Sequence, residues 1–282
     1  MNNLFLNSDE KKIEESFLKN GYYVFPVEDR GMLDELRLKV FQFGKNLLES
    51  KIASKSLEDF FDYTHEFLTV DQLNDFRVSM IRMMADDPNL RHSLYHLAKR
   101  HLHTIVGNEL AMQRAANLSI QLPNDDSSLL PLHTDVWHGN SPYEVVFWLP
   151  FVDCFKTKSM YILPREKSDV ILSDFPRYSK LSREEMFHEI SCDLIWPEVP
   201  YGHAVIFSHG TLHGNRVNEE NKTRWTFNVR YKSLLSPYST KALGETFWPI
   251  TIKPVTRIGF EYPNVKIGEI PGGFASYKSD KT

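Results

Sequence analysis

One β-strand is predicted by the apolar stretch GHAVIFSHGTLHGN, residues Gly202–Asn215. Its β-branched and aromatic side chains favour a pleated, partly buried conformation, and a turn rich in proline and glycine leads into it. The strand ends in His213, a residue type that often binds metals. On a regular strand His209 lies on the same face as His213, because side chains alternate between the two faces. The stretch therefore offers two histidines to one site.

A second metal-binding motif is the triplet His133-Thr134-Asp135. On a β-strand, side chains two residues apart point to the same face, so His133 and Asp135 can reach one metal while Thr134 points away. With His213, two imidazoles and one carboxylate would form the facial triad of non-haem Fe(II) oxygenases, which leaves three positions for co-substrate and oxygen. His209 stays open as the alternative third ligand.

An arginine strand follows the histidine strand. The segment Arg224–Tyr231 has the composition of a strand, and the polar turn Val217–Asn221 separates it from His213. If the two strands form a hairpin around this turn, His213 lies opposite Arg224. Arg224 and Thr226 then share a face, where a guanidinium and a hydroxyl can bind the same carboxylate.

A dicarboxylate bound by this clamp can reach the metal, which indicates 2-oxoglutarate. Arg230 is an alternative clamp on the same face. In the expected hairpin, however, it lies opposite Phe207, deeper along the strand and farther from the metal. The sequence therefore favours Arg224.

The chain resembles the Fe(II)/2-oxoglutarate-dependent dioxygenases of the phytanoyl-CoA dioxygenase-like group over most of its length. The resemblance rests on an opening helix followed by the strand Asn20–Pro26, the His-x-Asp pair, the tryptophan strand Val145–Pro150, the Leu163-Pro164 turn, and the Gly-to-His strand ahead of Arg-x-Thr. The spacing between the distal histidine and the arginine in that group favours His213 over His209. One departure is Arg165-Glu166-Lys167-Ser168, where family members commonly carry Gly-Ser/Thr-His after the Leu-Pro turn.

The resemblance implies an enzyme that uses Fe(II), 2-oxoglutarate and O2 and releases succinate and CO2. The implied metal ligands are His133, Asp135 and His213. The implied co-substrate residues are Arg224, Thr226 and Gln121, although Gln121 can equally satisfy a backbone group at a strand end. Related halogenases have a small residue in place of the aspartate, so Asp135 favours hydroxylation or another oxidative outcome.

The candidate substrate-binding residues are polar or aromatic: Trp137, His138, Trp148 and Arg165. Two of them have simpler explanations, because His138 on a loop is otherwise solvated and Trp148 is otherwise a core residue. A wider set of aromatic, polar and cationic residues around the expected mouth suits a small polar metabolite or a carbohydrate-type substrate, including one that bears a phosphate: Trp137, His138, Asn140, Tyr143, Lys156, Lys158, Arg165 and Lys167. Two other functions stay open: a cupin-like metalloenzyme that does not use 2-oxoglutarate, and a non-catalytic binding module on the same barrel.

The expected fold is mainly β with helical additions: a double-stranded β-helix, also called a jelly roll or cupin-like barrel, flanked by N-terminal helices. Within a single dioxygenase domain spanning 1–282, residues 1–115 read as mostly helical after one early strand. Residues 116–235 read as the jelly-roll core, and residues 236–282 as a C-terminal extension that wraps the barrel. The helices expected in the first part are Ser8–Lys19, Gly31–Ser50 and two helices within Val70–Gly107.

Composition and net charge limit the kinds of molecule that the protein is expected to bind. The 282 residues are 41% hydrophobic, which is enough for a substantial core, and the net charge of −4 without a long basic block disfavours nucleic acid and anionic membranes. We therefore expect a small-molecule substrate, and the oligomeric state is left open.

Two cysteines, no secretory signal and no membrane-length apolar run indicate a reduced, cytoplasmic protein.

Four histidines lie close together in the helical part: His92, His96, His101 and His103. No acidic or cysteine third ligand stands at helical spacing from them. We expect them to form a solvated helix face without a metal.

Overall fold

The computed structural model describes residues 4–48, 55–85 and 87–262. A seven-stranded antiparallel sheet runs through its centre, in the order β1-β6-β4-β8-β2-β9, with β3 also paired to β8. The strands are β1 Tyr22–Pro26, β2 Leu110–Gln113, β3 Asn117–Gln121, β4 Glu144–Pro150, β6 His203–Ser208, β8 Arg224–Ser233 and β9 Phe247–Thr251. A small second sheet pairs β5 Tyr161–Ile162 with β7 His213–Gly214. The two sheets form the core of a jelly roll with helical additions, which confirms the predicted fold class.

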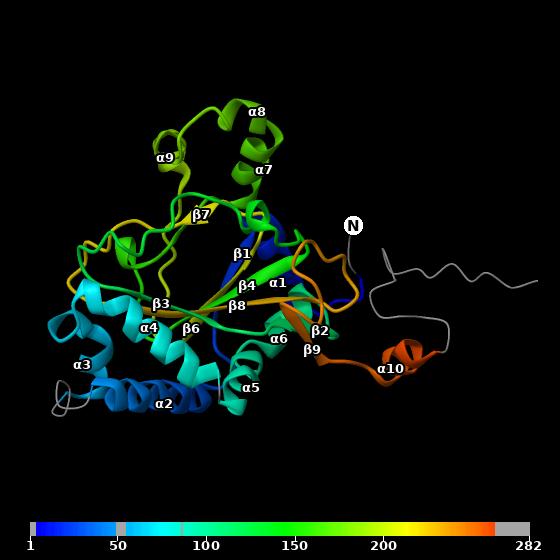
Figure 1. Ribbon diagram of the computed structural model, residues 1–282. Helices are drawn as coiled ribbons and strands as arrows, with labels where there is room; N and C mark the ends of the chain where they lie inside the picture. The colour runs from blue at the N-terminus through cyan, green and yellow to red at the C-terminus, as the bar shows by residue number, and fades with distance from the viewer. Residues whose placement is uncertain (1–3, 49–54, 86, 263–282) are drawn as a thin grey trace, which may run out of the picture.

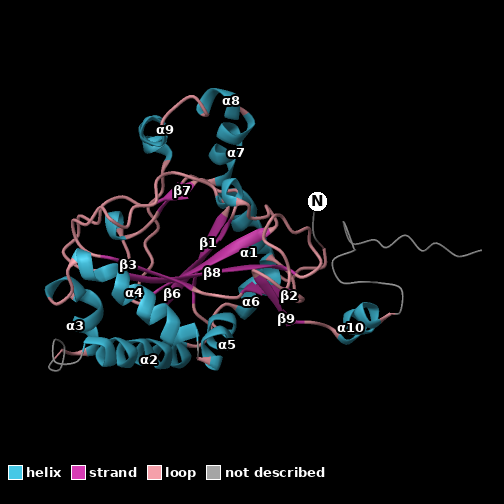
Figure 2. Cartoon of the chain, in the orientation of Figure 1, coloured by secondary structure: helices cyan, strands magenta, loops and turns pink. Residues whose placement is uncertain are grey.

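Helices gather on two sides of the strands (Figures 1 and 2). The N-terminal ones are α1 Ser8–Asn20, α2 Arg30–Leu48, α3 Leu57–Asp62, α4 Val70–Ala85, α5 Pro88–His96 and α6 Lys99–Ile105. An insertion between β5 and β6 contributes α7 Arg165–Ser173, α8 Phe175–Tyr178 and α9 Arg183–Ile190, which project beyond the small sheet. The last described helix, α10 Pro254–Glu261, follows β9. None of the described helices has the length and apolar character needed to cross a membrane.

The predicted helices Ser8–Lys19 and Gly31–Ser50 correspond to α1 and α2, although residues 49 and 50 lie outside the described chain. The region Val70–Gly107 contains three helices where two were predicted, because the chain also turns between α5 and α6. The insertion α7–α9 was not predicted. Its last helix does carry a sequence signal, the capping box of Ser182 and Glu185.

The C-terminal segment reaches the sheet through β9, which pairs antiparallel with β2 at the sheet edge. Beyond it, Thr256 on α10 donates a hydrogen bond from Oγ1 to the Glu109 carboxylate at 3.0 Å. The predicted wrapping of the barrel by residues 236–282 extends into 263–282, which lie outside the described residues. The proposed internal boundaries near 115 and 235 stay predictions.

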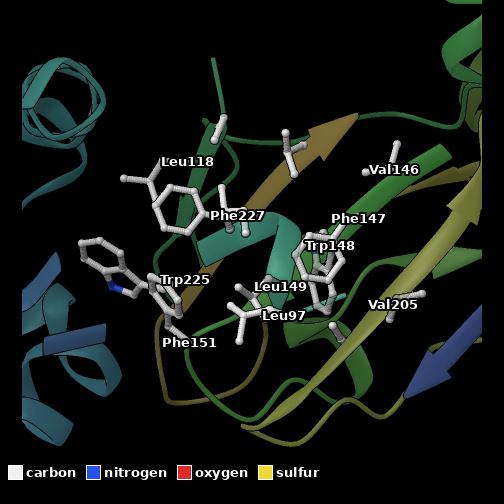
Figure 3. Packing of buried hydrophobic residues seen from close by; sticks show 14 of the residues in the cluster. Leu97, Leu118, Val146, Phe147, Trp148, Leu149, Phe151, Val205, Trp225 and Phe227 are labelled. Carbon is white, nitrogen blue, oxygen red and sulfur yellow. The ribbon is translucent and has the colours of Figure 1, made fainter. Parts of the chain in front are cut away.

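Strand β8 alternates between two environments, and its odd-numbered side chains form the centre of the core (Figure 3). Trp225 is fully buried and contacts Phe60, Phe61 and Phe76 with ring centroids 5.2–6.0 Å away. Its Nε1 donates a hydrogen bond to Oγ1 of Thr64 at 2.8 Å, so the indole N–H is satisfied inside the core. The helices therefore fix which face of β8 points away from them.

Helix α6 packs against β1 through His101, whose ring stacks on Phe25 with centroids 3.9 Å apart. The prediction of a solvated histidine face is wrong at this position, because His101 is only 9% exposed. Burial, together with the nearby charge of Arg100, lowers the pKa of His101 to about 4. The ring is therefore neutral at physiological pH.

This burial predicts a pH dependence of stability. In the unfolded chain a histidine is half-protonated at about pH 6.5, whereas His101 in the folded protein stays neutral down to about pH 4. Protonation therefore favours the unfolded chain between these two values, and the folded state loses stability as the pH falls through this window. Urea unfolding of the wild type and of His101→Phe at pH 7 and pH 4.5 measures the effect. The variant is expected to lose roughly 2 kcal/mol less between the two pH values.

The exposed His188 on α9 provides the control, and His188→Phe should keep the wild-type pH dependence. An unchanged pH dependence in His101→Phe would contradict the assignment of this titration to His101.

Candidate metal centre

Three side chains predicted to act together meet at one point. The ligand atoms of His133, Asp135 and His213 all lie within 4.8 Å of one another, and the three residues are 5–7% exposed. In the described part of the chain this is the one group of three or more His, Cys, Asp or Glu side chains close enough to hold a metal ion. Two imidazoles and one carboxylate are the donor set of the facial triad.

The backbone brings the two histidines together directly. His133 and His213 form an isolated antiparallel bridge, with N–H···O distances of 3.0 and 2.9 Å between their main chains. Asp135 does not lie on the predicted strand, because a 3-10 helix begins there and extends to His138. Thr134 between them is extended, with φ −110° and ψ 148°, and the spacing of two still places His133 and Asp135 on the same side.

Backbone carbonyls orient both imidazoles. Nδ1 of His133 donates to the carbonyl of Pro131 at 2.8 Å, and Nδ1 of His213 donates to the carbonyl of Thr211 at 2.9 Å. A carbonyl can only accept, so each Nδ1 carries the hydrogen and each Nε2 keeps its lone pair. Burial lowers the pKa of both rings, that of His133 to about 4, so both are neutral at pH 7. They are in the form that binds a metal.

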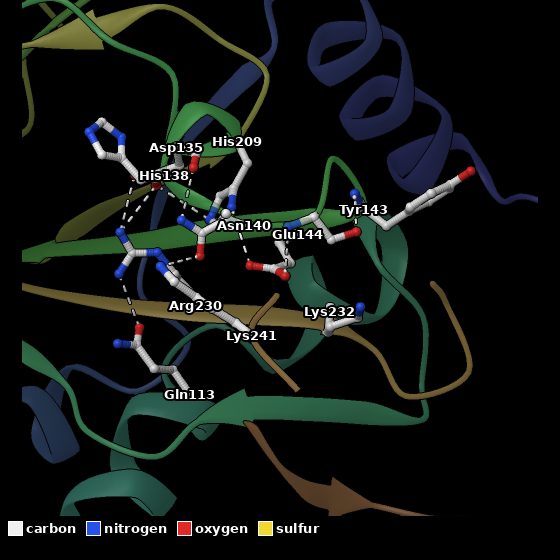
Figure 4. A network of polar contacts seen from close by, with 12 residues as sticks. Gln113, Asp135, His138, Asn140, Tyr143, Glu144, His209, Arg230, Lys232 and Lys241 are labelled. Carbon is white, nitrogen blue, oxygen red and sulfur yellow. Dashed lines mark hydrogen bonds and ion pairs between the residues drawn. The ribbon is translucent and has the colours of Figure 1, made fainter. Parts of the chain in front are cut away.

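Asp135 is held from behind by two other residues (Figure 4). Nη2 of Arg230 lies 3.2 and 3.3 Å from its two carboxylate oxygens, and Nε2 of His209 lies 3.4 Å from Oδ2. Burial acts to raise the pKa of Asp135, but the positive charges that face it at low pH, those of protonated His213 and of Arg230, outweigh burial, and the pKa lies well below its ordinary value. The carboxylate is therefore ionised.

His209 lies behind the cluster. The predicted single strand is broken, since β6 ends at Ser208 and β7 begins at His213, so His209 and His213 do not share a strand. His209 is fully buried, with Nδ1 3.3 Å from the carboxylate of Glu144. Of the two histidines that the sequence offered, the structure brings His213 into the cluster and places His209 between two carboxylates.

The cluster faces a cavity between the two sheets. The large sheet contributes Trp148, Phe207, Arg224, Asn228 and Arg230 to the cavity lining, from β4, β6 and β8. Arg224, Asn228 and Arg230 of β8 line the cavity, on the face opposite the odd-numbered residues, which are buried against the helices.

Arg224 is a buried cation without an ion-pair partner among the described residues. It is 3% exposed, and its guanidinium donates to the carbonyl of Ser159 at 3.3 Å and to Oγ of Ser119 at 3.4 Å. Within the described part of the chain its Nε has no hydrogen-bond partner, and neither has Oγ1 of Thr226 on the same face. Burial lowers the pKa of Arg224 to about 10, so it stays charged at neutral pH. A buried charge of this kind is costly unless an anion pairs with it.

No protein-family model matches the sequence, and no curated protein matches it significantly. Several solved structures are similar over most of their length. They include the non-heme monooxygenase ThoJ in its apo form, with 13% identity, 86% of this chain and 84% of that chain covered, and a TM-score of 0.49. EctD from S. alaskensis with bound Fe is 15% identical, with 83% and 79% covered and a TM-score of 0.48. The epimerase SnoN in complex with Fe3+, alpha ketoglutarate and nogalamycin RO is 14% identical, with 87% and 97% covered and a TM-score of 0.47.

The strand pairing differs from the predicted hairpin. Arg224 pairs with Gln121 of β3, whereas His213 belongs to the small sheet with β5. The reason is the turn after Ser208, which carries the chain from the large sheet to the small one. His213 and Arg224 therefore line the same cavity from different sheets.

The expected position of Arg230 was also wrong. It pairs with Val146 of β4, not with Phe207, and its guanidinium contacts the carboxylate of Asp135. Arg230 is thus next to the metal cluster. The prediction failed because it depended on the hairpin register.

Three other residues predicted to bind the co-substrate or substrate lie differently relative to the cavity. Gln121 donates from Nε2 to the carbonyl of Arg216 at 2.7 Å, which agrees with the structural alternative, while its Oε1 is unpartnered. Trp148 is 4% exposed and both packs in the core and lines the cavity. Arg165 turns away from the cavity, because it donates to the carbonyl of Leu18 and pairs with Asp169.

Two aromatic candidates lie beside the ligands. The ring of His138 contacts that of His133 with centroids 5.3 Å apart. Trp137 is 37% exposed and packs on Phe175 of α8, with centroids 5.3 Å apart. The insertion therefore contacts the 3-10 helix that carries Asp135.

Sequence reasoning missed the support around the cluster. Asn140 donates from Nδ2 to the main-chain carbonyl of Asp135 at 2.9 Å and accepts from Nζ of Lys241 at 2.9 Å. Glu144 is buried behind His209. These residues come from separate loops and strands, and no spacing in the sequence links them.

Gly214 next to His213 provides a test of the backbone geometry. A Cβ at this position would lie 2.6 Å from the carbonyl oxygen of Leu130 and closer still to the hydroxyl of Tyr161. Gly214→Ala must therefore shift β7, and with it the His133–His213 bridge. We expect an affinity for Ni(II), measured by isothermal titration calorimetry, that is about tenfold weaker or worse.

Gly259→Ala on α10 is the matched control, because a Cβ there meets no atom of the described residues within 4 Å. Equal Ni(II) affinity in the two variants, with both folded by circular dichroism, would show that the bridge does not set the geometry of the cluster.

Proposed function

We propose that the protein is a non-haem Fe(II)/2-oxoglutarate-dependent oxygenase that hydroxylates a small polar metabolite or carbohydrate-type substrate, with release of succinate and CO2. The observation that carries the proposal is the presence, in one cavity, of the His133, Asp135 and His213 cluster and the unpaired cation of Arg224. The cluster supplies metal ligands and the cation supplies a site for a carboxylate.

The donor set fits iron(II). His133 and His213 would bind through Nε2, since Nδ1 of each ring is committed to a backbone carbonyl. Asp135 would bind through its ionised carboxylate, held in place by Arg230 and His209. Three protein ligands leave coordination positions for other molecules, as the chemistry of these oxygenases requires. The bound iron would supply the activation of oxygen that accompanies oxidative decarboxylation of 2-oxoglutarate.

Arg224 and Thr226 would bind the far carboxylate of 2-oxoglutarate. The guanidinium is fixed by Ser119 and Ser159, which leaves Nε free to donate. A buried arginine can recognise a carboxylate with high geometric specificity, because its planar fork matches the two oxygens. Gln121 is a further candidate through the second hydrogen of its Nε2, because the first is donated to the carbonyl of Arg216 and its Oε1 can only accept.

The substrate would enter beside the 3-10 helix Asp135–His138. Trp137 and His138 lie there, and Trp148 lines the cavity from β4. A flat aromatic surface next to polar groups suits a polar ring such as a sugar. The chemistry expected for an intact Asp135 ligand is hydroxylation.

Anaerobic addition of Fe(II) and then 2-oxoglutarate tests the proposal. Chelation of the iron should produce a visible metal-to-ligand charge-transfer band, which His133→Ala and Asp135→Ala are expected to abolish. Arg224→Met should weaken the 2-oxoglutarate affinity, read from the same band, by at least ~10-fold while Fe(II) still binds. His188→Ala on the exposed face of α9 is the control and should behave as the wild type.

Two results would favour the alternatives. Metal binding with an activity that Arg224→Met leaves unchanged would indicate a cupin-like metalloenzyme that does not use 2-oxoglutarate. Absence of any Fe(II) binding to the wild type would indicate a non-catalytic binding module.

A further inference from the structure

Arg230 is a second cation in the same cavity as Arg224. The two lie on the same face of β8, six residues apart, and both line the cavity. Nη2 of Arg230 contacts both oxygens of Asp135, and Nη1 donates to Oε1 of Gln113 at 3.2 Å. Its Nε is buried and has no hydrogen-bond partner among the residues that the structure describes. Arg230 can therefore donate to one more group.

The charges that line the cavity do not balance. Among the described residues Asp135 is the one carboxylate in the lining, and Arg224 and Arg230 are two cations. The two histidines add no charge as ligands, because each donates its Nδ1 hydrogen to a backbone carbonyl and offers the lone pair of Nε2. The protein thus contributes one excess positive charge. Iron(II) would add two and 2-oxoglutarate would remove two, so one excess positive charge remains. A low-dielectric cavity holds such a charge at a high cost unless an anion neutralises it.

The charged residues behind the cavity lining do not neutralise its excess positive charge. Lys241 lies beside Arg230 and Asp135 and donates to Asn140, while Lys232 lies near Glu144. The carboxylate of Glu144 thus faces the two ammonium groups of Lys232 and Lys241, so the residues behind the cavity lining are also more cationic than anionic. No carboxylate of the described residues other than Asp135 pairs with Arg230.

Metal binding would strengthen this imbalance at Arg230. Asp135 is at once the ion-pair partner of Arg230 and a member of the metal cluster. A divalent ion drawn to this carboxylate competes with the guanidinium for the same negative charge. The attraction between Arg230 and Asp135 would therefore be weaker with a metal bound, and a second anion would then be the better partner for Arg230.

We infer that the primary substrate carries an anionic group, a carboxylate or a phosphate, and that Arg230 binds it. The inference rests on the proposed function, because it assigns Arg224 to 2-oxoglutarate. It makes Arg230 the residue that distinguishes anionic substrates from neutral ones of the same shape. The polar or carbohydrate-type substrate is then an acid or a phosphate ester.

Small anions can test this without knowledge of the substrate. The protein is loaded anaerobically with Fe(II) and saturating 2-oxoglutarate, and acetate, inorganic phosphate or neutral acetamide is titrated at constant ionic strength. We expect acetate or phosphate, but not acetamide, to shift the charge-transfer band and raise the melting temperature in a saturable way. The two anions distinguish a carboxylate from a phosphate as the preferred group.

Substitutions at Arg230 locate the effect. Arg230→Gln should weaken the anion affinity at least ~10-fold, and Arg230→Lys should keep part of it, because it retains the charge but not the planar fork. Arg100→Gln is the matched control, since Arg100 also pairs with an aspartate, at 2.9 Å from Asp9, but on an exposed surface. It should respond as the wild type does.

Several outcomes would overturn the inference. One is an equal anion response in Arg230→Gln and the wild type, and another is no response to either anion. Loss of Fe(II) affinity in Arg230→Gln with an unchanged anion response would assign Arg230 to the positioning of Asp135 alone. Bleaching of the band by the anions would mean that they displace 2-oxoglutarate. Absence of the band in the wild type before any anion is added would instead refute the proposed function, so the two failures are distinguishable.

Discussion

Strand β8 presents Arg224, Asn228 and Arg230 to the cavity because its odd-numbered side chains are buried against the helices on the opposite face. Trp225, Phe227, Val229 and Tyr231 are all fully buried, and Trp225 is tied to Thr64 by the hydrogen bond of its indole. A shift of one residue in register would exchange the two faces and place arginines in the apolar core. The core and the charged cavity are thus two consequences of one pairing. The loss of Trp225 alone would be expected to cost about 3–5 kcal/mol of stability.

The protein's own contacts fix the side chains of the metal cluster. Its two histidines are connected through their main chains, each ring is oriented by a carbonyl two residues earlier, and Asp135 is held by Arg230 and His209. Each ligand therefore has a partner that limits its rotation. Such preorganisation reduces the conformational entropy lost when a metal binds, and it keeps the open coordination positions in a fixed direction.

Local periodicity predicted part of this arrangement, and long-range packing determined the rest. The spacing of His133 and Asp135 was enough to place them on one side, and the alternation of β8 was enough to place Arg224 and Thr226 on one face. The choice between His209 and His213 could not be made from periodicity. It depends on the turn after Ser208, which moves the chain to the other sheet. The hairpin prediction failed for the same reason, and with it the expected position of Arg230.

Buried polar atoms without hydrogen-bond partners are what distinguish a cavity that binds a ligand from an incidental cluster of polar residues. Nε of Arg224, Oγ1 of Thr226 and Oδ1 of Asn228 lie on one face of β8 and are buried without a hydrogen-bond partner among the described residues. Each such atom costs about 1–3 kcal/mol if it stays unpaired. A core that only had to be stable would replace these residues by apolar ones at little cost. Their positions along β8 extend from Arg224 toward Arg230 and the carboxylate of Asp135, so a ligand that satisfies them must be polar and must reach toward the cluster. This requirement favours a cavity in which a bound molecule and a metal act together over one that binds either alone.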